Sequence, residues 1–162
     1  MIDIEAEILL PDGGTIPAGD LKTSVTLADM FGNPQTVKRR KTVSEKEYHY
    51  LKFENGKSFV CLPYLSILTW EDQIDANNLE VGDKVLGYKN GKLCEIKVAD
   101  SLPITIYNKK HLGMPKKVKM LFFESYEDMP FVANEVVVGL RKQLRLIENP
   151  VPTDERLQYA DL

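Results

Sequence analysis

The sequence has few of the features that mark secreted, metal-binding or membrane-spanning proteins. Only two cysteines, Cys61 and Cys94, occur in 162 residues, and they do not form a CxxC pair. A disulfide scaffold and a zinc site of cysteines are therefore both disfavoured. No run approaches the length of a membrane span, and the N-terminus has acids where a signal peptide has bases. We expect an intracellular protein with reduced thiols, no bound metal and no other cofactor.

A strong net charge is also absent. Lys and Arg number 21 against 24 Asp and Glu, which gives a formal net charge of −3. This balance does not predict binding to nucleic acid or to a membrane. Basic clusters at residues 38–41 and 109–119 could contact phosphates. Because both lie among acidic segments, solvated lysines that protect strand edges are the simpler interpretation.

Helical periodicity is scarce, whereas short alternating or β-branched runs fill residues 5–139. Only residues 71–80 and 140–148 carry a weak helical pattern. The turn sequences PDGG, FGNP, ENGK and KNGK separate several of the runs. The expected strands span residues 6–10, 35–43, 47–53, 57–65, 84–89, 93–99, 103–108, 117–125 and 131–138. The pattern predicts a mostly β domain with many hairpins and little helix.

Residues 14–38 resemble residues 72–97 within the same chain. The matched pairs are Ile16 with Ile74, Ala18 with Ala76, Leu21 with Leu79 and, after a two-residue gap, Val25 with Val85. Two hairpins can share such residues by coincidence because they share turn chemistry. The alternative is a duplicated β unit with pseudo-two-fold symmetry.

The C-terminal part has a different composition. The sequence NPVPTDERLQYADL carries two prolines and few apolar residues, so it adds little to a core. We therefore divide the chain into a β domain, residues 1–140, and a tail, residues 141–162. The tail is a candidate for docking on a partner protein, and Thr153 could cap a short helix in it.

Three blocks, ENGKSFVCLPYLSILTW, QIDANNLEVGDKVLGYKNGK and SYEDMPFVANEVVVGL, occur in this order between residues 54 and 140. Together with the opening AEILLPDGGTIPAGDL, they resemble the Hint superfamily of hedgehog autoprocessing domains and inteins. The likeness spans nearly all of residues 1–140, and its middle block is the most specific. It implies a flat β horseshoe of two pseudo-symmetric units, which would account for the internal repeat.

The resemblance also shows which catalytic residues are missing from this sequence. The nucleophile, a cysteine or serine in the family, falls on Met1, whose thioether cannot attack and which has no residue before it. The threonine and histidine of the motif TPxHxILT fall on Leu62 and Leu65, which offer no hydrogen bond and no titratable group. The terminal His-Asn pair of splicing members falls on Gly139 and Leu140.

The surrounding scaffold residues of these motifs persist, although Glu135 replaces a usual glycine near the end. This combination is typical of a fold kept for its shape. The length also leaves no room for a homing endonuclease.

Other candidate residues have simpler structural interpretations. His49 could be a general base, but a packed strand histidine is favoured, and His111 lies in a lysine-rich loop. Asp12 and Asp83 stand in turns that need a local hydrogen bond. Asp128 lies where some family members place an assisting acid, but it has no evident partner.

The sequence therefore predicts a catalytically inactive Hint-like domain that acts as a structural or protein-binding module. Its expected partners are other protein subunits, contacted through the tail, and by analogy it could be a subunit of a phage or virus particle. Two alternatives stay open. One is an autoprocessing, intein-like enzyme that uses a non-standard nucleophile such as Cys61, and the other is a nucleic-acid binder.

Overall fold

The computed structural model describes residues 2–22, 24–37, 39–124 and 130–139, with only the backbone for 39–41, 123 and 124. These residues form fifteen strands and two single-turn 3-10 helices. The strands of the N-terminal half are β1 (Ile2–Asp3), β2 (Glu7–Leu9), β3 (Thr15–Pro17), β4 (Val25–Ala28), β5 (Pro34–Val37), β6 (Arg39–Glu45), β7 (Tyr48–Phe53) and β8 (Ser58–Cys61). Those that follow are β9 (Ser66–Leu68), β10 (Gln73–Asp75), β11 (Lys84–Lys89), β12 (Lys92–Ile104), β13 (Val118–Glu124), β14 (Phe131–Ala133) and β15 (Val136–Gly139). The helices are η1 (Ala18–Asp20) and η2 (Ala76–Asn78).

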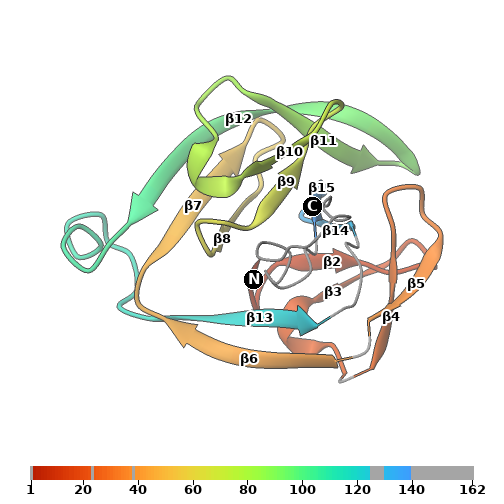
Figure 1. The fold of residues 1–162 in the computed structure, drawn as a ribbon, viewed down its shortest axis with the longest axis horizontal. Helices are drawn as coiled ribbons and strands as arrows, with labels where there is room; N and C mark the ends of the chain where they lie inside the picture. Colours follow the sequence, from red (N-terminus) through yellow and green to blue (C-terminus); the bar gives the residue numbers. More distant parts are fainter. Residues whose placement is uncertain (1, 23, 38, 125–129, 140–162) are drawn as a thin grey trace, which may run out of the picture.

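Thirteen of the strands form one antiparallel sheet, and β4 and β5 form a separate hairpin. Figure 1 shows the long strands β6, β7, β12 and β13 on the outside of the molecule, with short strands such as β2, β9 and β14 inside. This is the mostly β horseshoe that the sequence predicts. Within the described residues, no helix is long and apolar enough to cross a membrane.

The longest strand, β12, joins the two sides of the sheet. Its first part, as far as Lys97, pairs with β11, and its second part, from Val98 onward, pairs with β7 with an irregularity between Val98 and Asp100. Ile96 and Val98 are buried while Lys97 is exposed, so the predicted alternation is confirmed. An irregularity of this kind bends the strand and increases its twist, because it inserts one extra residue.

The internal repeat corresponds to a repeated structural unit. In each half a short strand, β3 or β10, runs into a single 3-10 turn, η1 or η2, and a hairpin follows. Ala18 N donates to Ala6 O, and Ala76 N donates to Leu65 O, at 2.8 Å in both cases. The two alanines are fully buried in the main core. The interpretation as a duplicated unit with pseudo-two-fold symmetry is therefore confirmed.

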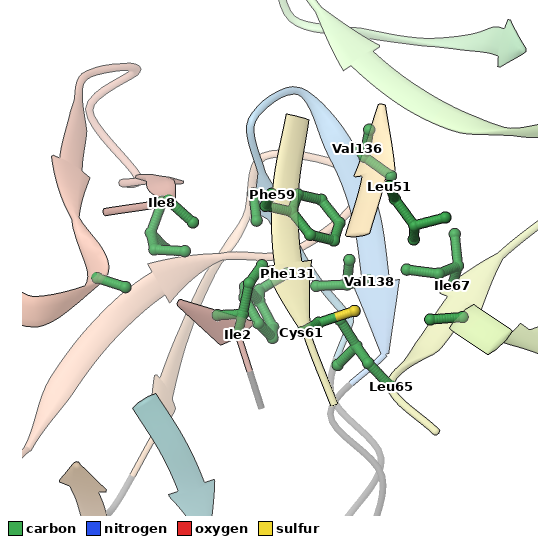
Figure 2. Close-up of a cluster of buried hydrophobic side chains, with 14 of the residues drawn as sticks. Ile2, Ile8, Leu51, Phe59, Cys61, Leu65, Ile67, Phe131, Val136 and Val138 are labelled. Atoms are coloured by element: carbon green, nitrogen blue, oxygen red, sulfur yellow. The ribbon is translucent and has the colours of Figure 1, made fainter. Parts of the chain in front are cut away.

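The first strand, β1, pairs with β8 on one side and with β13 on the other. Ile2 stands directly opposite Cys61 in the antiparallel pair with β8. Around this contact lies the main hydrophobic cluster, part of which Figure 2 shows, with side chains such as Leu65, Phe131 and Val138. A second cluster contains the buried residues Tyr48, Leu62, Ile104 and Met120.

Several expected elements have different bounds in the structure. The helix expected over residues 71–80 is wrong, because Gln73–Asp75 pair with β9 and only Ala76–Asn78 form a 3-10 turn. On an α-helix Ile74 would point away from the face shared by Ala76 and Leu79. In the structure Ile74 pairs with Ile67 of β9, and the turn that follows buries Ala76 and Leu79.

Strand boundaries differ as well. The strand expected over residues 57–65 ends at Cys61, since Pro63 has no N–H for a ladder hydrogen bond. Residues 35–43 contribute to two strands, and residues 93–99 and 103–108 contribute to the single strand β12. The possible helix over 140–148 lies outside the described residues.

Candidate functional site

The positions that the Hint resemblance singles out come together in part, around β9 and β15. Gly139 stands opposite Ser66 in this strand pair, and Val138 stands opposite Ile67. Leu65 directly precedes Ser66, the residue that faces Gly139. Leu65 and Gly139 are therefore close in the fold, although 74 positions separate them in the chain. Met1 and Leu140 lie outside the described residues, as do Asp128 and the tail.

Leu62 and Leu65 belong to one tight turn, since Leu65 N donates to Leu62 O at 3.0 Å. Leu65 is 6% exposed and belongs to the main cluster with Cys61 and Val138 (Figure 2). Leu62 is 5% exposed and belongs to the second cluster, with Tyr48 and others. The turn thus places one leucine in each of two apolar clusters.

Gly139 approaches β9 so closely that a side chain at this position would be crowded. A Cβ built on Gly139 would lie 3.0 Å from Ser66 Cβ and 3.0 Å from Gln73 Oε1. The Ser66 hydroxyl is buried and donates to Gln73 Oε1. Sequence analysis missed this hydroxyl at the site, because its place follows from the pairing of β9 with both β10 and β15.

Cys61 is a buried thiol. Its side chain is fully buried, and this burial raises the pKa of the thiol to about 12. Sγ contacts His49 O at 3.8 Å, and the S–H is the donor in this contact. Because the thiolate is the nucleophilic form of cysteine, this burial disfavours the reactive form of Cys61.

His49 lies opposite Cys61 on the neighbouring strand, but its ring forms a hydrogen bond with Ser101. His49 Nε2 is 2.8 Å from Ser101 Oγ, and Ser101 Oγ donates to Leu79 O at 2.6 Å. Since the hydroxyl hydrogen is used on Leu79, Nε2 must carry the proton and donate to Ser101. Burial lowers the pKa of His49 and favours the neutral ring. The histidine is a packed, hydrogen-bonded strand residue, as the sequence favoured.

The role of Ser101 could not be read from the sequence. It lies on the second part of β12, which pairs with β7, and it follows the register shift between Val98 and Asp100. The register that brings Ser101 beside His49 therefore depends on a long-range strand pairing.

The carboxylates of the acidic candidates accept hydrogen bonds from backbone N–H groups. Asp12 Oδ1 accepts from Gly14 N at 2.8 Å, and Asp83 Oδ2 accepts from Glu80 N at 2.9 Å, so the two predicted turn roles are confirmed. Asp3 accepts from Val60 N, and burial raises the pKa of its carboxyl. Within the described part of the chain, no group of three or more His, Cys, Asp or Glu residues could hold a metal ion.

The basic segments differ from each other. His111 and Lys110 are exposed, as expected for solvated residues. Lys109 is an exception, because it is 7% exposed and its Nζ donates to Lys46 O and Lys116 O. The side chains at residues 38–41 lie outside the described part of the chain.

The turn between β14 and β15 forms even though Glu135 replaces a glycine. Asn134 and Glu135 both have left-handed backbone angles, with φ of 49° and 69°. The side-chain amide of Asn134 stabilises this left-handed turn. Its Oδ1 accepts from Glu7 N at 2.8 Å, and its Nδ2 donates to Ser58 O at 2.6 Å. Glu135 also forms an ion pair with Lys57 at 3.4 Å.

No model of a protein family matches the sequence, and no curated protein matches it. Solved structures do match the fold. A DnaB intein from Synechocystis sp. PCC 6803 has a TM-score of 0.65 at 15% identity, over 85% of this chain and 95% of the other. The MchDnaB-1 intein has a TM-score of 0.63 at 13% identity, over 85% and 98% of the two chains. A bacterial intein-like domain from Clostridium thermocellum has a TM-score of 0.61 at 17% identity, also over 85% and 98%. The chain therefore has the Hint fold of inteins and intein-like domains.

Proposed function

We propose that this chain is a catalytically inactive Hint-like domain that serves as a structural or protein-binding module. The observation that carries the proposal is the burial of Leu62 and Leu65 at 5% and 6% exposure. The resemblance to inteins places the working threonine and histidine at these two positions. Both are instead part of apolar clusters.

The physical chemistry of these side chains supports inactivity. A leucine can neither polarise a scissile amide nor transfer a proton. Burying each one contributes about 1.5–3 kcal/mol to the free energy of unfolding. Leucine at these two positions thus stabilises the core but supplies no catalytic group.

The rival function is an autoprocessing enzyme that uses Cys61 as an internal nucleophile. Burial raises the pKa of this thiol to about 12, so the thiolate is scarce at neutral pH. A base would have to remove its proton, yet the ring of His49, on the neighbouring strand, is hydrogen-bonded to Ser101. Both observations favour the inactive module.

The role of the module belongs to the same proposal. Protein subunits are its proposed partners, and residues 141–162 are a proposed docking segment because Leu144, Leu146 and Leu157 alternate with charges there. A place inside the cell, and in a phage or other virus-like particle, is proposed by analogy with compact β scaffolds that serve as subunits of assemblies.

Intact-mass spectrometry of the purified chain, incubated with and without a strong thiol, tests the proposal. We expect one unchanged mass under both conditions. Cleavage at a defined peptide bond would overturn inactivity. The variant Cys61→Ala is the matched control, because cleavage that disappears with it would establish the rival enzyme.

A further inference from the structure

Exposed apolar side chains of this protein gather in two segments of opposite charge. The large hydrophobic side chains exposed in the described residues are Phe31, Tyr64, Trp70, Val81, Ile106, Tyr107 and Leu112. All except Phe31 lie either in residues 64–83, here called the acidic segment, or in residues 105–117, here called the basic loop.

The acidic segment combines apolar exposure with negative charge. It contains five acids, Glu71, Asp72, Asp75, Glu80 and Asp83, and no Lys, Arg or His. Trp70 is 59% exposed at the turn between β9 and β10, beside the exposed Glu71. Thr69 Oγ1 donates to Asp72 Oδ1 at 2.9 Å, and this hydrogen bond braces the turn.

The basic loop combines apolar exposure with positive charge. It contains four lysines and His111 and no acid. Tyr107 is 88% exposed, and Ile106 and Leu112 are 50% and 43% exposed. Figure 1 shows the loop between β12 and β13 at the outer edge of the molecule, well away from β9 and β10. The two segments therefore do not cover each other within one molecule.

The basic loop is held in a fixed shape by buried polar contacts. The Lys109 ammonium donates to two backbone carbonyls, and Met114 N donates to Lys109 O at 2.8 Å. Tyr48 OH donates to Pro115 O at 2.6 Å, which ties the loop to β7. A loop that buries a lysine while it exposes Tyr107 presents a preorganised surface, and preorganisation lowers the entropic cost of binding.

We infer that the basic loop binds the acidic segment of a second copy of this chain. The loop and the segment are opposite in charge, and each carries exposed apolar side chains, Tyr107 in the loop and Trp70 in the segment, that a contact would bury. Lysines of the loop can also stack on the face of Trp70. Contact between two different segments produces either a reciprocal dimer or a head-to-tail oligomer.

A protein surface fits the loop better than a nucleic acid does. Single-stranded nucleic acids use aromatic side chains for base stacking, whereas two of the three exposed apolar residues, Ile106 and Leu112, are aliphatic. The inference does not depend on catalytic inactivity, because association changes the native mass and cleavage changes the covalent mass.

Sedimentation analysis over about two decades of protein concentration tests the inference. We expect the native mass to rise with concentration and to fall towards that of the monomer in high salt, because salt screens the charges. Tyr107→Ser should weaken association by about tenfold or more. Phe31→Ser, which removes a side chain that is 66% exposed outside both segments, should leave it unchanged.

Charge substitutions in one segment at a time give a sharper test, because a mixture of the two variants still contains one unaltered loop and one unaltered segment. A loop variant, Lys110→Glu with Lys117→Glu, and a segment variant, Glu71→Lys with Glu80→Lys, should each be monomeric alone and should associate when mixed. The control Lys89→Glu with Lys92→Glu, at exposed positions in the β11–β12 turn, should behave as the wild type does. Circular dichroism should show that every variant is folded.

A wild-type chain that stays monomeric at every concentration would overturn the inference. Equal weakening by the control pair would also overturn it, since the effect would then be one of net charge. A monomer that is retained on phosphatidylserine vesicles or on an oligonucleotide would assign the loop to a different partner and would contradict self-association.

Discussion

The substitution Leu65→His places the imidazole of the Hint motif back at the position that the resemblance assigns to it. Leu65 is 6% exposed and is packed in the main cluster. Losing its apolar burial costs about 2 kcal/mol, and an unpaired buried imidazole adds about 1–3 kcal/mol. We therefore expect the free energy of unfolding to fall by about 3–5 kcal/mol, a large share of the roughly 5–15 kcal/mol typical of domains.

Urea unfolding followed by circular dichroism measures this loss. With a slope of about 1.5 kcal/mol per M, the midpoint should fall by about 2–3 M. Leu65→Met is a volume-conserving control and should cost less than about 1.5 kcal/mol. Leu112→His adds the same imidazole at an exposed position, and its effect should stay within about 0.5 kcal/mol.

The intact mass of Leu65→His should also stay constant, because one histidine does not supply a nucleophile. A stability within about 1 kcal/mol of the wild type would refute the packing argument. Cleavage produced by this single change would refute the view that the nucleophile is missing.

Three other expected outcomes concern Gly139, His49 and Cys61. Gly139→Ala should cost about 1–3 kcal/mol in urea unfolding, since its Cβ would meet Ser66 Cβ at 3.0 Å, and an unchanged midpoint would contradict that close approach. Burial lowers the folded-state pKa of His49, so its stabilising contribution is present above pH 6.5 and is lost as the pH falls through the folded-state pKa. Unfolding midpoints measured between pH 7 and pH 4 should show a loss that His49→Phe reduces, and equal slopes in both proteins would disprove it. Burial raises the pKa of Cys61 from 9.0 to about 12, so its contribution is complete below pH 9 and is lost as the pH rises through that interval. In a Cys94→Ser variant, which removes the partly buried second thiol, an aromatic disulfide reagent at pH 8 should therefore label Cys61 only after unfolding, and rapid labelling of the native variant would contradict the burial of Cys61.

Much of the fold could be predicted because local sequence patterns and tertiary packing agree. The alternation around Ile96 produces a half-buried strand, and glycine-containing turns separate the hairpins. The match of Ala18 with Ala76 reflects a real repeat, since both amides donate to an equivalent carbonyl at the same 2.8 Å distance.

The errors arose where strand pairing overrides local preference. Residues 71–80 are rich in polar residues that helices tolerate, yet Ile74 pairs with Ile67 of a neighbouring strand. The contacts of Ser66 and Ser101 could not be predicted for the same reason. The Ser66 hydroxyl finds its partner once the β9–β10 hairpin has formed, and the Ser101 hydroxyl finds Leu79 and His49 only after segments distant in sequence have come together.

The most direct test of inactivity is the intact mass of the chain expressed between two flanking reporter domains, because cleavage and splicing act on the junctions. An inactive Hint-like domain predicts a single species with the full covalent mass, before and after incubation with thiol. Released reporter domains would show that the junctions are cleaved. Two reporters joined to each other without this chain between them would show splicing, and either result would contradict the proposed inactivity.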